Sequence, residues 1–359
     1  MFRLILRMAG VAAYLLITLE MIFMVAPFAL YYYSAYSPLL STASRVSAIA
    51  WLPAFFLRHL STDIVPSVGG LILVLGFVGF LLSAFQLYHA KFMRRGMVRS
   101  VFYKRIRHPQ YLWLAISGLG LVIVWPRFVL LLVYVHMLWF YYLLARDEER
   151  RMRAAYGDAY QQHTHRTWMF LPGEPGGYLK QRLFGWIKNR RVQLFVVYGV
   201  SVAASIGIAF GSREISLGLT PHVRLRDERI AAISFQSASV QQLRKIVDST
   251  FANAEIQNRV KPLHEWVLVQ VMEGKSPLVH TMIDAGMTRA NARNLQLTDQ
   301  GTKIVVLHRT NAFTPNGDPF SVREVWQPIF IVEINENRIS RVLELNSYLF
   351  PANPVMPIF

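Results

Sequence analysis

Long apolar blocks with few polar interruptions constrain this chain more than any other feature. They cover residues 9–33, 68–88, 111–125, 128–145 and 193–210, and hydrophobic residues make up 53% of the 359-residue sequence. At about 1.5 Å per residue, roughly 20 helical residues cross a hydrocarbon core of about 30 Å. We therefore predict an all-α polytopic membrane domain with about five transmembrane helices.

Two segments near the beginning need separate interpretation. Residues 9–33 follow a basic start at Arg3 and Arg7, which also fits a cleaved signal peptide, but the apolar run is longer than the usual signal core and lacks a clear cleavage site. We expect a retained membrane anchor. Residues 46–60 are apolar but short and contain Pro53, so we expect an interfacial or re-entrant segment there, not a full span.

The middle blocks carry two packing signals. The block 68–88 contains four glycines, which offer a neighbouring helix close approach: Gly69, Gly70, Gly76 and Gly79. The sequence Trp125-Pro126-Arg127 separates the blocks 111–125 and 128–145, and a proline restricts the residue before it to extended conformations. We predict a helical hairpin at 109–149 with a tight turn at this break.

The basic residues lie beside the apolar blocks. Residues 1–210 hold 22 lysines and arginines against 7 acidic residues, whereas residues 211–359 hold 16 against 14. Short basic loops next to spans follow the positive-inside bias of membrane proteins and do not indicate nucleic-acid binding. With loops 91–110 and 146–192 in the cytoplasm, the N-terminus is cytoplasmic. We expect a bacterial inner-membrane protein whose residues after 210 are periplasmic.

The last part of the chain, residues 211–359, has the pattern of a soluble α+β domain. Val240–Phe251 has helical periodicity, and Asn335-Glu336-Asn337 is a plausible hairpin turn. Three strands are predicted, at Lys303–His308, Val325–Ile334 and Ile339–Leu345. This domain offers no catalytic constellation. It handles a substrate or a protein partner, or it is a structural appendage.

The sequence Arg107-His108-Pro109-Gln110-Tyr111 stands where a basic loop enters the third apolar block. Proline suits the first helical turn, where its missing N–H needs no partner, so His108 is the expected cap residue. The free amides and the positive end of the helix dipole form an anion site, with Arg107 beside it. The carboxylate of a small ligand fits such a site.

A second polar cluster, Asp147-Glu148-Glu149, follows the fourth block, with Gly157 and Tyr160 after it. Pro126 is 17 residues from Pro109 and 22 from Glu148, so the two arms of the hairpin differ by only roughly 8 Å. Both clusters therefore reach one depth. One wall of the site is a helix end that can hold an anion, and the other wall carries carboxylates. S-adenosylmethionine fits this pattern, because it has a carboxylate, an ammonium and a sulfonium.

The order Arg-His-Pro-x-Tyr, hairpin, Glu-Glu and Gly-x-x-Tyr, closed by Pro172, resembles the isoprenylcysteine carboxyl methyltransferase and phospholipid methyltransferase family of integral membrane methyltransferases. The resemblance covers about residues 68–172. It implies S-adenosyl-L-methionine as cofactor and, as acceptor, a lipid or lipophilic small molecule at the cytoplasmic face. It also implies a cofactor pocket lined by His108, Tyr111, Glu148 and Glu149. Catalytic roles would fall to Arg107, His108 and Tyr111, with Arg107 at the cofactor carboxylate or near the acceptor.

Two positions depart from the family pattern. Val101-Phe102-Tyr103-Lys104 stands where the family often has Gly-Pro-Tyr-Arg, and Trp113 replaces a common glycine, although Gly118 and Gly120 can offer space instead. These changes favour the alternative of a non-catalytic scaffold or ligand-binding protein on the same fold, with the C-terminal domain as its working part. The related sterol reductases share Arg-His-Pro-x-Tyr and bind a nicotinamide, but too few spans are present for their fold.

Simpler explanations compete with several of these residues. Arg107 is also explained as one more charge of a cytoplasmic loop, and Glu149 as part of a solvated helix face paired with Arg153 four residues on. His163 and His165 stand on a polar stretch without a pattern of metal ligands, so we expect solvated histidines and no metal.

Overall fold

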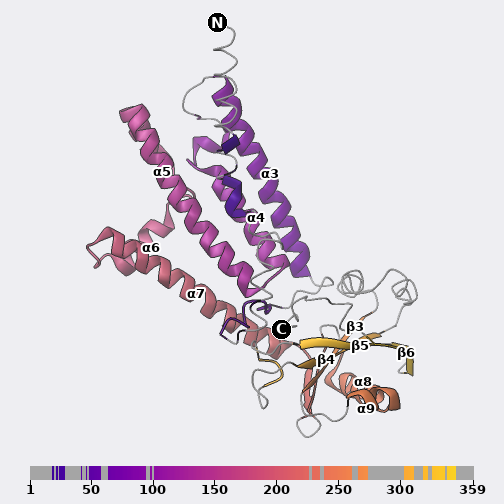
Figure 1. Ribbon diagram of the computed structural model, residues 1–359. Coiled ribbons are helices and arrows are strands. Elements are labelled where there is room, and N and C mark those ends of the chain that lie inside the picture. Colours follow the sequence, from indigo (N-terminus) through magenta and orange to yellow (C-terminus); the bar gives the residue numbers. More distant parts are fainter. Residues whose placement is uncertain are drawn as a thin grey trace. The chain divides into compact units, whose positions relative to one another are not determined.

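The computed structural model describes residues 18–19, 22, 24–28, 42, 46, 48–57, 64–93, 98, 101–225, 229–234, 238–260, 266–273, 303–310, 318–321, 326–335 and 338–344. The chain divides into two compact units (Figure 1). The first combines Met1–Tyr36, Ser67–Val124 and Leu130–Gly207. The second combines Ser37–Pro66, Trp125–Val129 and Ile208–Phe359.

Helices make up the described part of the first unit. They are α3 (Ile64–Phe92), the short 3-10 helix η1 (Val101–Lys104), α4 (Pro109–Val124), α5 (Phe128–Arg166), α6 (Pro175–Phe184) and α7 (Arg190–Leu219), which continues into the second unit. Among the described residues, α3, α5 and α7 are long and apolar enough to cross a membrane, and α4 is a shorter apolar helix of 16 residues.

Four of the five predicted apolar blocks lie in helices that the structure describes. The blocks 68–88, 128–145 and 193–210 lie inside α3, α5 and α7, and 111–125 forms α4 up to residue 124. Most of the block 9–33 lies outside the described residues, so the count of five spans stays a prediction. Residues 48–57 form turns and an isolated bridge between Phe55 and Arg127, with no helix in that stretch.

Glycines bring α3 and α4 into close contact. A Cβ on Gly76 would lie 2.4 Å from the backbone nitrogen of Ser117, and one on Gly120 would lie 2.4 Å from that of Leu73. The Ser117 hydroxyl donates to the Leu73 carbonyl at 3.0 Å. Three of the four predicted contact glycines, Gly69, Gly76 and Gly79, pack in this way, whereas Gly70 meets nothing within 4 Å. Small residues thus let the two helices approach.

Helix α5 runs beyond its apolar part. It continues past residue 149, where the predicted hairpin ends, and stops only at Arg166. Gly157 interrupts it with φ 50° and ψ −126°, a backbone conformation that a glycine adopts without a Cβ penalty. Three residues on, Tyr160 is buried. The glycine of the Gly-x-x-Tyr motif is thus a kink and its tyrosine is a buried residue.

A six-stranded mixed sheet with two helices forms the described C-terminal part of the second unit. Its strands are β1 (His222–Leu225), β2 (Ile230–Ser234), β3 (Val267–Glu273), β4 (Lys303–Thr310), β5 (Trp326–Asn335) and β6 (Arg338–Glu344), in the order β1 to β6. Only the pair β2–β3 is parallel among these strands, with α8 (Val240–Phe251) and α9 (Ala254–Val260) between them in the chain.

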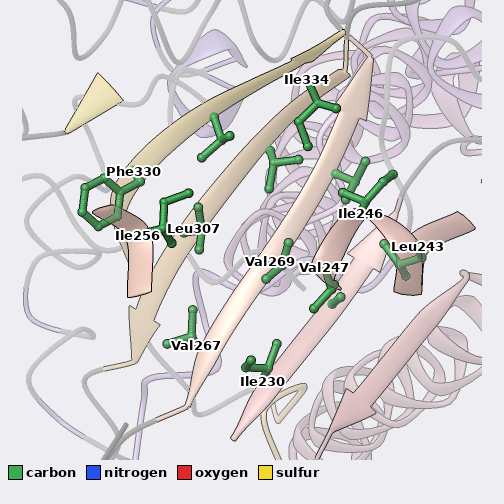
Figure 2. Packing of buried hydrophobic residues seen from close by; sticks show 14 of the residues in the cluster. Ile230, Leu243, Ile246, Val247, Ile256, Val267, Val269, Leu307, Phe330 and Ile334 are labelled. Atoms are coloured by element: carbon green, nitrogen blue, oxygen red, sulfur yellow. The ribbon is translucent and has the colours of Figure 1, made fainter. Parts of the chain in front are cut away.

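The core of this sheet lies against α8 (Figure 2). Leu243, Ile246 and Val247 share one face of the helix, and they pack with alternate residues of the strands, such as Val267 and Val269. A capping box fixes the start of α8: the Gln242 amide donates to the Ser239 hydroxyl at 3.2 Å, and the Gln242 side chain accepts from the Ser239 amide at 2.9 Å.

Candidate active site

Four of the five predicted site residues, Arg107, His108, Tyr111 and Glu148, line one cavity in the first unit, and Glu149 is not among its lining residues. Its volume is about 720 Å³, and its polar lining includes Tyr103, Arg107, His108, Tyr111, Glu148 and Tyr160. These side chains come from η1, from the residues between η1 and α4, from the first turn of α4 and from the polar part of α5. The hairpin thus brings both sequence clusters to one site.

The backbone of the Arg-His-Pro motif is held by the segment after α5. The Arg107 amide donates to the Trp168 carbonyl at 2.8 Å, and the His108 amide donates to the Met169 carbonyl at 3.2 Å. The His108 carbonyl accepts the first helical bond of α4, from Leu112 at 3.3 Å. His108 therefore stands in the predicted cap position.

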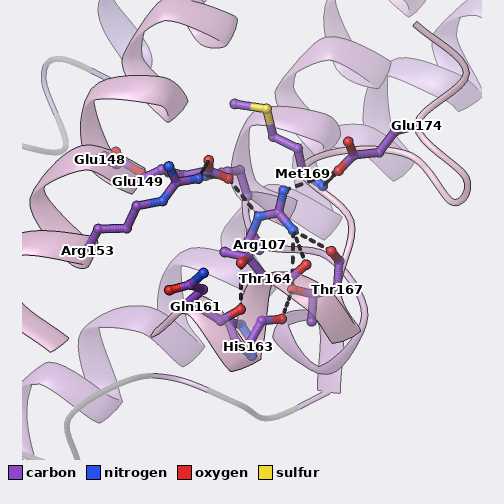
Figure 3. Close-up of polar contacts among 11 residues, drawn as sticks. Arg107, Glu148, Glu149, Arg153, Gln161, His163, Thr164, Thr167, Met169 and Glu174 are labelled. Carbon is purple, nitrogen blue, oxygen red and sulfur yellow. Dashed lines mark hydrogen bonds and ion pairs between the residues drawn. The ribbon is translucent and has the colours of Figure 1, made fainter. Parts of the chain in front are cut away.

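Arg107 is surrounded by acceptors (Figure 3). Its Nε donates to Glu149 Oε1 at 2.6 Å, one terminal nitrogen donates to the carbonyls of Thr164, at 3.1 Å, and Thr167, and the other donates to Glu174 Oε1 at 3.2 Å. Only 9% of the side chain is exposed. Arg107 is thus more than one basic residue of a loop, because it ties α5 to the segment that follows it.

His108 and Tyr111 both contact Glu148. Nδ1 of His108 lies 3.1 Å from Glu148 Oε2, and the Tyr111 hydroxyl donates to Glu148 Oε1 at 2.5 Å. The other ring nitrogen of His108 is buried, has no hydrogen-bond partner among the described residues and lies 3.7 Å from Glu149 Oε1. The Tyr111 ring stacks on that of Tyr141 at 5.1 Å.

Two carboxylates set the charge of His108. Burial by itself lowers the pKa of His108, but the hydrogen bond to Glu148 and the negative charges of Glu148 and Glu149 outweigh burial, so the pKa is raised above its usual 6.5. A neutral imidazole would turn a lone pair toward one carboxylate oxygen. The geometry and the pKa shift therefore both favour the imidazolium.

Glu149 does not behave as part of a solvated helix face. The predicted pairing with Arg153, four residues on, is present at 3.5 Å. However, only 11% of the Glu149 side chain is exposed, and its shorter contact is with Arg107. Of the two histidines expected to be solvated, His165 is exposed, whereas His163 is half-buried and lines the cavity.

The departures from the family pattern have different consequences. Trp113 is not among the lining residues of the cavity. A Cβ on Gly79 of α3 would lie 2.2 Å from its ring, and Phe102 meets it edge to face at 5.6 Å. The indole therefore fills a space between helices and leaves the cavity open. Val101 has a positive φ of 42°, which is strained for a β-branched residue.

Gly118 and Gly120 were expected to offer the cavity the space that a glycine at position 113 would give, but both pack against other helices. A Cβ on Gly118 would lie 2.8 Å from Met137 of α5, and Gly120 packs on α3. The family's tyrosine at position 103 is buried, and its hydroxyl donates to Gln110 Oε1 at 2.8 Å. Burial, and to a lesser degree the charge of Glu148, raises the pKa of Tyr103.

Three partners of Arg107 were not predicted from the sequence. Thr164, Thr167 and Glu174 lie at or after the end of α5, in a stretch without apolar periodicity. A parallel bridge between Ile106 and Trp168 brings this stretch to the motif. Such a pairing between distant irregular segments leaves no local signal.

The comparison with protein families agrees with this geometry. Residues 65–159 match the phospholipid methyltransferase family. The predicted resemblance is thereby confirmed over α3, α4 and most of α5, which make up about a quarter of the chain. His108, Tyr111, Glu148 and Glu149 all lie within the phospholipid methyltransferase segment, and it indicates a membrane methyltransferase. No curated protein and no solved structure matches the chain.

Proposed function

We propose that the membrane domain, residues 1–210, transfers a methyl group from S-adenosyl-L-methionine to a lipophilic or membrane-embedded acceptor at the cytoplasmic face. One observation carries the proposal. Glu148 is held by both His108 and Tyr111 at the wall of a cavity, within the segment that matches the methyltransferase family.

The residues present fit this cofactor. About 30% of the Glu148 side chain is exposed, so its carboxylate can face a positively charged ligand. The buried ring nitrogen of His108 without a hydrogen-bond partner adds an unused polar atom at the same wall. Residues His108, Tyr111 and Glu148 line the cavity and would hold the cofactor, which supplies an activated methyl group when bound. Glu149, which the resemblance also assigns to the cofactor, is paired with Arg107 and does not line the cavity.

We assign Arg107 a positioning role. Its charge is already matched by Glu149 and Glu174, so it holds the acidic wall in place more than it offers charge to a ligand. Methyl transfer from a sulfonium loses charge as the transition state forms. Alignment in a water-poor site can therefore supply most of the acceleration.

Apolar side chains also line the cavity. Leu19, Met24, Leu87 and Leu144 line it, which suits a hydrophobic acceptor that enters from the bilayer. An amine, thiol or hydroxyl acceptor must lose a proton, and an imidazolium at His108 cannot take it. The arrangement therefore favours an acceptor that attacks without losing a proton to His108, such as a carboxylate.

Two departures from the family pattern, Trp113 and Val101, favoured the alternative of a non-catalytic scaffold on the same fold, and Trp113 no longer does. Trp113 packs on Gly79 and does not fill the cavity, which leaves Val101 as the departure that favours this alternative. We further propose that the N-terminus is cytoplasmic and that residues 211–359 are periplasmic in a bacterial inner membrane, where they handle a substrate or a protein partner.

Calorimetric titration of the purified full-length protein tests the cofactor. S-adenosylmethionine and S-adenosylhomocysteine are titrated into the wild type, Glu148→Ala and Asp158→Ala. Asp158 is an exposed acid of the same helix outside the cavity lining, so its variant is the matched control. We expect micromolar binding by the wild type and the control, and none by Glu148→Ala. Absence of binding to well-folded wild type would make the scaffold the better account.

A further inference from the structure

Helix α6 presents large apolar side chains that nothing in the described part of the chain covers. No residue of α6 is buried. Tyr178 is 66% exposed and Trp186, just after the helix, is 78% exposed, and Leu179 and Leu183 are also exposed. Isolated exposed apolar residues are ordinary, but four large ones within nine residues are not.

The same segment is strongly basic. Residues 175–191 contain five basic and no acidic side chains, which are Lys180, Arg182, Lys188, Arg190 and Arg191. Large apolar side chains combined with lysine and arginine on a short helix are typical of helices that lie in the interface of a membrane. The combination is complementary to anionic phospholipid headgroups, at about 1 kcal/mol for each basic residue near the surface.

The position of α6 in the chain places it at such an interface. Helix α7 begins at Arg190, and its apolar block starts at residue 193, so Arg190 and Arg191 mark the point where the chain enters the membrane. Only residues 185–189 separate α6 from α7, so the six steps from Phe184 to Arg190 span at most about 22 Å. Helix α6 therefore cannot lie far from the bilayer surface.

Both ends of α6 are held, although its side chains are exposed. At its start, Glu174 Oε1 accepts from Arg107 and, at 2.7 Å, from the Met169 amide. At its end, the Gln193 side chain donates to the Phe184 carbonyl at 2.8 Å. A helix that is fixed at both ends presents these apolar residues to something other than the described part of the chain.

We infer that residues 175–191 form a docking surface for the bilayer itself, held by anionic phospholipid headgroups and by insertion of Leu179, Leu183 and Trp186 into the interface. The basic residues select the headgroup charge, and the apolar residues set the depth. This surface is separate from the methyl-transfer cavity, because none of its residues lines that cavity.

Spin labels can test this directly, since the sequence contains no cysteine and each introduced cysteine is the single labelling site. Leu183→Cys and Gln181→Cys are two residues apart on α6, about 200° around the helix, and serve as a matched pair. Each variant is reconstituted as full-length protein in nanodiscs of phosphatidylcholine alone or with phosphatidylglycerol. Accessibility of the label to oxygen and to a water-soluble nickel chelate is then measured.

We expect the label at 183 to favour oxygen and that at 181 to favour the nickel chelate. Phosphatidylglycerol should increase this difference. Lys180→Glu with Lys188→Glu should abolish the increase without changing the thermal stability of the protein. Equal access of the nickel chelate to both labels would overturn the proposal and favour a soluble protein partner. If the labels differ but phosphatidylglycerol does not change the difference, recognition of anionic headgroups is overturned.

Discussion

The Tyr111 hydroxyl donates to Glu148 Oε1 at 2.5 Å, which joins the first turn of α4 to the polar part of α5. The other end of this hairpin is the turn at Trp125-Pro126-Arg127. The two helices are thus connected covalently at one end and by a hydrogen bond to a carboxylate at the other. The site residues therefore also stabilise the fold.

This contact predicts an energetic coupling between the two residues. Tyr111→Phe should destabilise the protein by about 2 kcal/mol, since a hydrogen bond to a charged group contributes about 1.5 to 3 kcal/mol. The double variant with Glu148→Gln should lose less than the sum of the single losses. Tyr141→Phe is the control, because the Tyr141 hydroxyl is buried without a hydrogen-bond partner among the described residues. Unfolding in detergent measures all four variants, and additive losses would contradict the coupling.

The raised pKa of His108 predicts that stability depends on pH. The folded state favours the protonated ring, so this contribution is fully present below the ordinary histidine value of about 6.5 and is lost as pH rises through the raised folded value. The melting temperature should therefore fall as pH rises above about 6.5. His108→Gln should remove this part of the pH dependence. An unchanged pH profile in the variant would assign it to other groups.

The packing of α3 on α4 predicts opposite behaviour of two glycines. Gly76→Ala places a methyl group 2.4 Å from the Ser117 backbone nitrogen and should cost about 1 to 3 kcal/mol through overpacking. Gly70→Ala meets nothing within 4 Å, and it should leave stability unchanged or raise it slightly because alanine favours helix. Thermal unfolding of the pair gives the comparison. Equal effects would mean that the helices do not approach at Gly76.

The positive φ of Val101 predicts a stabilising substitution. Val101→Gly should raise stability by about 1 kcal/mol, because glycine adopts this conformation without the clash of a Cβ. The side chain is 70% exposed, so little burial is lost. Val101→Ala keeps the Cβ and should gain less. A gain from alanine equal to that from glycine would show that the strain does not come from the Cβ.

The sequence predicted those elements whose signals are local. The helix Val240–Phe251 has the predicted bounds because its apolar face repeats with the helical period and Ser239 and Gln242 cap it. The strands predicted at 303–308, 325–334 and 339–345 lie within a few residues of β4, β5 and β6. Strands β1, β2 and β3 and helix α9 were not predicted. Strands β1 and β2 have only four and five residues, too few for a periodic pattern. The seven residues of β3 and of α9 have no turn signal like the one that marked the equally long β6.

The same distinction holds for the site. Counting the two arms of the hairpin predicted that the cluster with His108 and Tyr111 and the cluster with Glu148 would lie at one depth, because helical rise fixes the length of each arm. The contacts of His108 and Tyr111 with Glu148 were not predicted by the count. The direction of Trp113 could not be predicted, because it depends on the space that Gly79 leaves on another helix. The acceptors around Arg107 depend on a bridge between irregular segments, which has no periodicity to detect.

The order of the sheet from β1 to β6 is also the order of the chain, so each strand pairs with strands that are its neighbours in sequence. Such a sheet can be assembled progressively as the polypeptide leaves the ribosome or the translocation channel behind α7. Among the six described strands, none is inserted between two strands that precede it in the chain. The order of assembly in this part of the protein is therefore expected to follow the order of synthesis.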